Sequence, residues 1–342
     1  MSTRLAIPSV AGASVTTVVK GSLSSPSVAV GQALPLPWAD VPAPFSEALV
    51  ELGHRSPEVV VLTADLMHWT DTLAFAEAFP DRFWNVGMAE QNLVGVGAGM
   101  ARAGAFPVIV TYGVFAARRA YDQVAMSLCT GGVRALLVGF LPGISSQFRA
   151  THQALDDVAL MRALPGMTVL DPADATELTA MVLGAPERPG PSYVRASRGL
   201  VPRVFTGVPE MTCARRVREG PDAVLVSSGI GTRWALEAAA LLSSRSVEAE
   251  VQHHPMLKPF DDDAVADLAQ RHRVLHCVEN HSTVGGLAAA VSCAMAARGL
   301  GVRVVAHGIP DRWAEYGRMD FNRGMLGLDA ASIAAAVERE IK

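Results

Sequence analysis

Short apolar runs that alternate with helical patterns constrain the fold of this chain more than any other feature. The runs at residues 59–63, 108–112 and 135–140 are almost continuously apolar, which is typical of strands buried on both faces of a parallel sheet. Stretches with apolar residues at helical spacing separate them. The alternation predicts an α/β fold, with mainly parallel sheets covered by helices on both faces.

This alternation is interrupted between residues 201 and 219, where prolines and glycines break any regular period. We therefore expect a linker there, between two doubly wound domains that comprise residues 39–200 and 220–342. Residues 1–38 are rich in Ser, Val, Ala and Pro without a steady period. They predict an N-terminal arm that is either disordered or wrapped around a partner subunit.

The same patterns give the expected elements of each domain. In the first domain we expect helices at 45–52, 72–79, 91–103, 115–128, 155–164 and 173–183, and strands at 59–63, 84–86, 108–112, 135–140, 168–170 and 192–194. In the second we expect strands at 223–227, 248–252, 274–278 and 302–306, and helices at 232–242, 262–271, 285–297 and from 330 onward.

Composition argues against several classes of protein. The net charge of −4 leaves no surplus of positive charge for a nucleic-acid backbone. The apolar runs fall far short of the ~20 residues that span a bilayer, and the first residues lack the apolar core of a signal peptide. Cys129, Cys213, Cys277 and Cys293 are widely spaced, so we expect reduced thiols in a cytoplasmic protein, with no metal site and no disulfide framework.

Three local patterns resemble ligand sites without the expected context. The glycines within residues 95–99 fall inside an expected helix, so close helix packing is favoured over dinucleotide binding. Residues 228–231 follow a strand and could hold a phosphate on their amides, but an ordinary turn is favoured without a basic partner. His253 and His254 are adjacent, so in a strand they point to opposite faces and do not share a metal.

Glu90 is the most informative residue. It lies in Asn-Val-Gly-Met-Ala-Glu-Gln-Asn at residues 85–92, where an expected strand passes into a helix rich in Gly and Ala. Ligands bind at such strand ends in parallel sheets. The alternative is that Glu90 only stabilises the first turn of its helix through the helix dipole.

Three further segments carry a resemblance to a known family. The chain has Thr-Tyr-Gly-Val-Phe at 111–115, Arg-Ala-Tyr-Asp-Gln at 119–123 and Thr-His-Gln at 151–153, followed by two aspartates at 156–157. In this order and spacing it resembles the pyrimidine-binding and C-terminal domains of transketolases over residues 42–342. No Gly-Asp-Gly with a distal Asn, the family's metal-diphosphate signature, occurs in the sequence. The resemblance therefore implies thiamine diphosphate with Mg²⁺ or Ca²⁺ held mainly by a partner α subunit, in an α2β2 heterotetramer.

The resemblance also implies which residues contact the cofactor. Glu90 would hydrogen-bond N1' of the aminopyrimidine and so activate the cofactor, a role in which burial of the carboxyl helps. Phe115 would stack on the pyrimidine, with Tyr112 as a second aromatic of that wall. Asp65 and Arg119 would lie close to the cofactor. The alternatives are that the two aromatic residues belong to the core and that Asp65 caps a helix.

For the substrate, the resemblance implies that His152 faces the reacting carbons and transfers protons. Arg198 would bind the sugar phosphate, with Arg195 as its neighbour, although surface charge pairing is an equal alternative for both.

At three positions the chain departs from the family. Phe148 replaces an acid that contacts a hydroxyl of the acceptor, Phe140 stands where a phosphate-binding histidine is usual, and Trp69 stands where a serine is usual. An apolar ring cannot replace these hydrogen bonds, each worth about 1.5 to 3 kcal/mol when charge-assisted. We therefore expect an atypical acceptor that is more apolar or unphosphorylated, with these three residues still lining the substrate site.

Two other functions compete with a transketolase subunit. The β subunit of a 2-oxo acid dehydrogenase shares the glutamate and Tyr-Asp-Gln but usually has a His-Ser-Gln loop where this chain has Thr-His-Gln. A non-catalytic regulatory subunit could keep the fold and lose the chemistry. The joint presence of Glu90, Phe115 and His152 argues against that loss.

Overall fold

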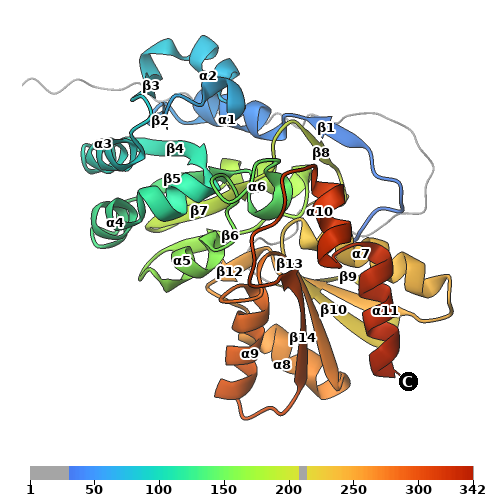
Figure 1. The fold of residues 1–342 in the computed structure, drawn as a ribbon. Coiled ribbons are helices and arrows are strands. Elements are labelled where there is room, and N and C mark those ends of the chain that lie inside the picture. The colour runs from blue at the N-terminus through green and yellow to red at the C-terminus, as the bar shows by residue number, and fades with distance from the viewer. Residues whose placement is uncertain (1–30, 208–213, 342) are drawn as a thin grey trace, which may run out of the picture.

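The computed structural model describes residues 31–207 and 214–341. Two α/β domains lie side by side, the first drawn in blue to yellow-green and the second in yellow to red (Figure 1). Most of the expected N-terminal arm, residues 1–30, lies outside the described residues, as does Cys213. Two domains with mainly parallel sheets confirm the fold class predicted from the alternating pattern.

The first domain is built on a seven-stranded sheet in the order β12-β6-β7-β5-β4-β2-β3. Its strands are β2 (Val59–Thr63), β3 (Phe83–Asn85), β4 (Phe106–Tyr112), β5 (Ala135–Phe140), β6 (Thr168–Leu170), β7 (Pro191–Ala196) and β12 (Met256–Lys258). The first six are parallel, whereas β12 pairs with β6 in the antiparallel direction. Since β12 comes from beyond the linker, the second part of the chain completes the sheet of the first.

Helices cover both faces of this sheet, as the apolar strands predict. In β2, Val60 and Leu62 belong to one hydrophobic cluster and Val59 and Val61 to another, on the opposite face. The helices are α1 (Pro44–Arg55), α2 (Leu73–Ala78), α3 (Glu90–Arg102), α4 (Tyr121–Gln123), α5 (Asp157–Ala163) and α6 (Ala175–Leu183).

The helix expected at 115–128 differs in detail. The segment consists of a π-helical turn η3 (Phe115–Arg119), the single turn α4 and a second π-helical stretch η4 (Val124–Cys129). Such wide turns are frequent at functional sites. The irregular turn begins with Phe115 and ends with Arg119, two residues for which the family resemblance implies cofactor contacts.

The second domain contains a five-stranded sheet in the order β14-β13-β10-β11-β9. Its strands are β9 (Arg215–Pro221), β10 (Ala223–Ser227), β11 (Ala249–His253), β13 (Val274–Ser282) and β14 (Arg303–Ile309), of which only β9 is antiparallel to its neighbour. The helices are α7 (Gly231–Ser243), α8 (Asp262–Arg271), α9 (Leu287–Ala297), α10 (Met319–Leu326) and α11 (Ala330–Ile341).

The segment expected as a linker is partly ordered into strands. β8 (Leu200–Pro202) pairs with β1 (Asp40–Pro42), and β9 joins the second sheet. The sequence did not predict β9, because it is an edge strand rich in arginine, with Val217 as its buried residue. The described end of the arm packs on this segment, since the Leu34 amide donates to the Val204 carbonyl over 2.7 Å.

Two expectations from composition can be compared with the described part of the chain. Cys129, Cys277 and Cys293 are free thiols. Within residues 31–207 and 214–341, no helix has both the length and the apolar character needed to cross a membrane.

Candidate active site

The candidate site lies at the carboxyl ends of neighbouring parallel strands in the first sheet. Asp65 follows β2, Glu90 follows β3, Phe115 follows β4 and the loop with His152 follows β5. Because β3, β2, β4 and β5 are adjacent and parallel, their carboxyl ends meet at the same edge. The sheet thus brings together segments that lie up to about 90 residues apart in sequence.

Glu90 is the first residue of α3 and is only 2% exposed. Its carboxylate is bound by Arg119, whose Nη1 lies 2.9 Å from Oε1 and 3.0 Å from Oε2. Arg119 itself is half exposed. Glu90 therefore combines a favourable position in the helix dipole with a buried, charge-paired carboxylate.

An aromatic wall stands beside this carboxylate. The rings of Tyr112 and Phe115 stack with centroids 5.9 Å apart and an interplanar angle of 25°. The ring of His152 lies 5.4 Å from Phe115 and 6.1 Å from Tyr112. Arg119 lies over the face of Phe115 at 4.1 Å from the ring centroid. Tyr112 is 6% exposed and belongs to the hydrophobic core, whereas Phe115 is partly exposed and packs against that core, so Phe115 is the ring that reaches the surface.

Asp65 has a positive φ of 59° and is tied to the end of the neighbouring strand. Its amide donates to Asn85 Oδ1 over 2.9 Å, and Asn85 Nδ2 donates to Asp65 Oδ1 over 3.1 Å. The short helix that follows begins at Met67 and has no side-chain cap. Asp65 therefore holds the loop instead of capping a helix, and Asn85 is a partner that the sequence pattern did not indicate.

His152 is carried by the loop between β5 and α5. Thr151 Oγ1 lies 2.8 Å from His152 Nδ1, which fixes one ring nitrogen. Burial, followed by the nearby positive charge of Arg119, lowers the pKa of His152 below its ordinary value of 6.5. The imidazole is therefore neutral at pH 7. The ring of Phe148, which is 48% exposed, lies 5.0 Å from it.

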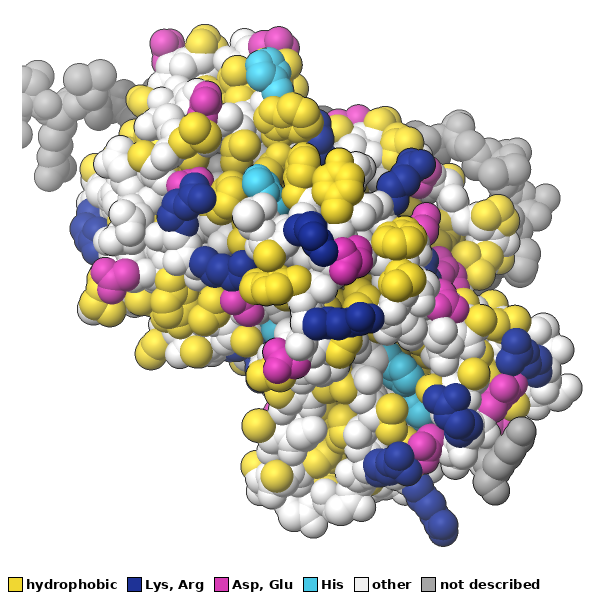
Figure 2. Space-filling model, viewed as in Figure 1, with side chains coloured by type: hydrophobic (Ala, Val, Ile, Leu, Met, Phe, Trp, Pro, Cys, Tyr) yellow, Lys and Arg dark blue, Asp and Glu magenta, His cyan; other side chains and the backbone are white. Residues whose placement is uncertain are grey.

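The second domain holds this loop in place. The Ile144 amide donates to Asn280 Oδ1 over 3.0 Å, and Asn280 Nδ2 donates to the Pro142 carbonyl over 2.9 Å. The exposed ring of Tyr316 lies 6.4 Å from Phe148. Figure 2 shows apolar side chains gathered over this junction of the domains. Neither Asn280 nor Tyr316 stood out in the sequence, because both come from distant segments.

Arg198 and Trp69 lie next to each other at the rim. The Arg198 guanidinium is 4.8 Å from the centroid of the exposed Trp69 ring, and its Nη2 donates to the His68 carbonyl over 3.2 Å. Asp71 pairs with it more loosely, at 4.0 Å. Burial raises the pKa of Tyr112, and the charge of Arg198 opposes that rise. Arg198 is thus electrostatically coupled to the aromatic wall.

Arg195 is placed elsewhere than the sequence suggested. Its side chain is 1% exposed and binds both oxygens of Asp157 at 2.9 and 3.1 Å, Asp171 at 3.2 Å and the Asn280 carbonyl at 2.8 Å. Burial acts to lower the pKa of Arg195, but the two carboxylates outweigh it and raise the pKa above its ordinary range. Four of its five N–H donors are engaged and its side chain is buried, so Arg195 joins the two domains and is not exposed to a substrate.

Phe140 also lies away from the site, contrary to its expected place in the substrate pocket. Its ring is fully buried and packs edge to face on Phe45, with centroids 5.1 Å apart. Because inward and outward residues alternate along a strand, Phe140 points into the core on the α1 side of the sheet.

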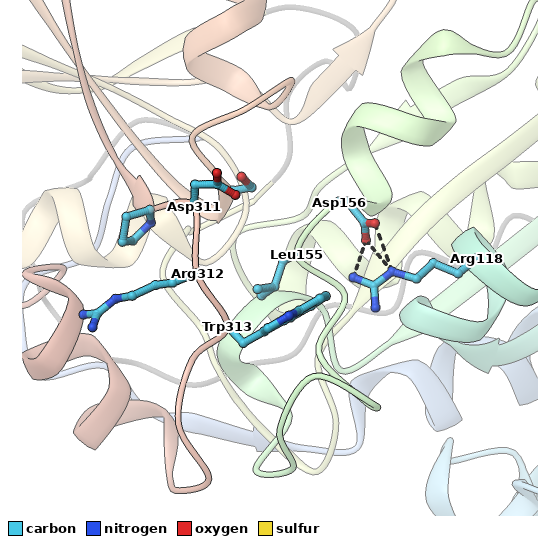
Figure 3. A pocket seen from close by; sticks show the side chains of 8 residues that line it. Arg118, Leu155, Asp156, Asp311, Arg312 and Trp313 are labelled. Atoms are coloured by element: carbon cyan, nitrogen blue, oxygen red, sulfur yellow. Dashed lines mark hydrogen bonds and ion pairs between the residues drawn. The ribbon is translucent and has the colours of Figure 1, made fainter.

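A cavity of about 320 Å³ lies beside the loop, between the domains. Arg118 forms a forked pair with Asp156, at 2.8 to 3.0 Å, and lies 4.9 Å from the Trp313 ring (Figure 3). Neither Glu90 nor His152 lines it. The cavity is therefore a neighbour of the candidate site and not part of it.

The three patterns that resembled ligand sites have structural explanations. A Cβ on Gly97 would lie 2.5 Å from Ile109 Cδ1, so this glycine allows close packing of the helix on the sheet. At the turn after β10, the Asp171 carboxylate lies against Gly229, which disfavours a phosphate there. His253 binds Glu177 and Thr232, and no group of three or more potential metal ligands occurs among the described residues.

Comparison with known proteins identifies both domains. Residues 39–204 match the transketolase pyrimidine-binding domain and residues 213–333 match the transketolase C-terminal domain. A transketolase family protein of Sinorhizobium fredii is 38% identical over 87% of this chain and 88% of its own length. A 6-deoxy-6-sulfo-D-fructose transketolase subunit of a Clostridium strain is 34% identical over 85% and 91%. A 1-deoxy-D-xylulose-5-phosphate synthase of Geobacter sulfurreducens is 35% identical over 86% of this chain, which spans only 47% of that enzyme.

Solved structures agree with these matches. A split-gene transketolase, described as an inactive β4 tetramer, superposes with a TM-score of 0.78 at 37% identity, over 87% of this chain and 97% of the other. A transketolase from Campylobacter jejuni shares the fold, with a TM-score of 0.71 at 19% identity over 90% of this chain and 48% of the other. By its two domains, its relatives and its fold, this chain belongs to the transketolase family.

Proposed function

We propose that this chain is the smaller subunit of a split, thiamine diphosphate-dependent transketolase-like enzyme. It would transfer a two-carbon ketol unit from a ketose donor to an aldehyde-type acceptor. The observation that carries the proposal is the buried carboxylate of Glu90 next to the aromatic wall of Tyr112 and Phe115, with His152 facing the same wall. Membership of the family implies dependence on thiamine diphosphate.

The residues present suit the pyrimidine half of that cofactor. Glu90 is a buried carboxyl group that can share a proton with a ring nitrogen, and Phe115 offers a partly exposed ring on which a flat heterocycle can stack. Thiamine diphosphate, when bound, supplies a nucleophilic carbon that accepts the ketol unit. Asp65, held by Asn85 at the end of β2, would line the same end of the sheet.

His152 would move the substrate's protons. Its lowered pKa keeps the imidazole neutral at pH 7, so it can accept a proton from a substrate hydroxyl and later return it. Thr151 holds Nδ1, and the other ring nitrogen is left for the substrate. The loop that carries His152 is anchored by Asn280, which supports the fixed placement that proton transfer requires.

A partner subunit would complete the active centre. The sequence has no Gly-Asp-Gly signature, so an α subunit would bind the diphosphate and its Mg²⁺ or Ca²⁺, most simply in a cytoplasmic α2β2 assembly. The split-gene relative described as an inactive β4 tetramer supports this division of labour. We expect this chain to be inactive by itself.

The acceptor would be atypical, with less dependence on a phosphate. Phe148 lies beside His152 where an acid would bind an acceptor hydroxyl, and Tyr316 adds a second exposed ring. The Arg198 guanidinium already contacts the Trp69 ring, Asp71 and the His68 carbonyl. These contacts favour an apolar or unphosphorylated aldehyde.

Reconstitution tests the proposal. The chain would be combined with a subunit of the same source that carries the diphosphate-binding domain, and ketol transfer would be measured to ribose 5-phosphate, unphosphorylated aldehydes and aromatic aldehydes. Transfer that requires both subunits supports the proposal, and a strong preference for ribose 5-phosphate would remove the atypical acceptor. Reduction of a lipoyl domain by the pair would indicate a 2-oxo acid dehydrogenase instead. A pair that binds no thiamine diphosphate would indicate a non-catalytic subunit.

A further inference from the structure

Arg119 touches both surfaces on which the proposed cofactor site depends. Its guanidinium donates to both carboxylate oxygens of Glu90, at 2.9 and 3.0 Å. The central carbon of the same group lies over the Phe115 ring, 4.1 Å from its centroid. Arg119 therefore contacts both groups that would hold the aminopyrimidine. These are the Glu90 carboxyl group, which would bind the ring nitrogen, and the Phe115 ring, which would stack on the pyrimidine.

A guanidinium and an aminopyrimidine present similar chemistry to these two residues. Both are flat, both carry N–H donors in their plane, and both stack on an aromatic face. A carboxylate recognises such in-plane donors through short, charge-assisted hydrogen bonds. Two flat groups cannot fill the same space between Glu90 and Phe115, so one must leave before the other enters.

We propose that Arg119 holds the place of the cofactor's aminopyrimidine and must swing away from Glu90 and Phe115 when the cofactor binds. This inference rests on the proposed function. The side chain is suited to such a movement because it is 51% exposed, whereas Glu90 is 2% exposed. Until it moves, Arg119 compensates a carboxylate that would otherwise be buried without a partner.

Arg119 also acts on His152. Its positive charge is the second cause, after burial, of the lowered pKa of that imidazole. Among the contacts of the described residues, Thr151 and the rings of Tyr112, Phe115 and Phe148 are the other groups that face His152. Removal of the Arg119 charge therefore raises the pKa of His152, which gives a readout independent of catalysis.

Arg118 provides a matched control, because it is the adjacent arginine but pairs with Asp156 and Trp313. Arg119→Met and Arg118→Met remove the same charge from the same turn. Binding of thiamine diphosphate to the reconstituted pair, in the presence of Mg²⁺, would be measured by calorimetry. We expect Arg119→Met to bind about three- to tenfold more tightly than the wild type, since an ion pair with one half-exposed partner no longer competes, and Arg118→Met to bind as the wild type does.

An affinity that is unchanged or weaker in Arg119→Met overturns the inference. Arg119→Lys keeps the charge but loses the planar guanidinium over the Phe115 ring, so it should bind with intermediate affinity and serves if the methionine variant does not fold. In the full chain alone, the pKa of His152 followed by NMR should rise in Arg119→Met and stay unchanged in Arg118→Met. No rise would contradict the placement of Arg119 beside His152.

The outcomes separate this inference from the proposed function. A wild-type pair that binds no thiamine diphosphate overturns both. A wild-type pair that binds the cofactor, together with an Arg119→Met pair that binds it no more tightly, overturns only the role of Arg119.

Discussion

Replacing Arg195 by methionine distinguishes a structural arginine from one that binds substrate. The guanidinium makes four hydrogen bonds, to both oxygens of Asp157, to Asp171 and to the Asn280 carbonyl. Methionine fills much of the same volume but supplies no donor. The variant therefore leaves two buried carboxylates and a buried carbonyl without their shared cation.

The loss of stability in Arg195→Met depends on which hydrogen bonds the two aspartates keep. Asp157 keeps the Tyr193 hydroxyl at 2.8 Å, and Asp171 keeps the Ser228 hydroxyl at 3.0 Å. Neither neutral donor replaces the lost charge, and removal of one partner from a buried pair typically costs about 3 to 5 kcal/mol. We expect Arg195→Met to lower the free energy of unfolding by about that amount.

Urea unfolding followed by far-UV circular dichroism measures this loss. Arg55→Ala is the control, because it removes an exposed pair with Glu51 on the surface of α1 and should cost less than about 1 kcal/mol. If Arg195→Met also costs less than about 1 kcal/mol and instead weakens substrate binding in the reconstituted pair, the reasoning is refuted.

Three further predictions concern the proposed chemistry of the reconstituted pair. Glu90→Gln keeps the shape of the side chain but not its charge, so kcat for ketol transfer should fall about 100-fold or more without loss of folding by circular dichroism. A pair that keeps its activity would remove Glu90 from the mechanism. Because the pKa of His152 is depressed, the decline of kcat/KM at acid pH should have its midpoint below the ordinary imidazole pKa of 6.5, and His152→Ala should abolish that limb of the pH profile. Phe148→Asp restores an acid beside His152 and should raise kcat/KM for hydroxyaldehydes about tenfold relative to aromatic aldehydes; an unchanged ratio would show that Phe148 does not select the acceptor.

Much of the fold follows from local patterns in the sequence. The strands at 59–63, 135–140, 168–170 and 223–227 have the predicted bounds, because continuous apolar runs are stable only when a sheet is covered on both faces. The proximity of Glu90, Phe115 and His152 follows too, since each comes after the carboxyl end of a neighbouring parallel strand.

Elements that form only through contacts with distant segments could not be predicted from the sequence. β9 is rich in arginine and β12 is a short segment between Pro255 and Pro259, so neither carries a recognisable pattern. Each forms because an open sheet edge offers backbone hydrogen bonds. Tyr316 and Asn280 likewise reach the His152 loop only after the second domain has docked.

By itself, the sequence determined which residue types stand at the ends of the strands, and hence that Glu90, Phe115 and His152 share one edge of a sheet. Only the tertiary structure decided which charges face each other. Arg195 and Arg119 are both arginines that the sequence placed at the site. Arg195 is buried between two aspartates, whereas Arg119 is paired with Glu90. The reason is physical: the pattern of apolar residues determines which segments form helices and strands and which faces they bury, whereas the partner of a charge depends on which distant carboxylates the packed domains bring within hydrogen-bonding distance.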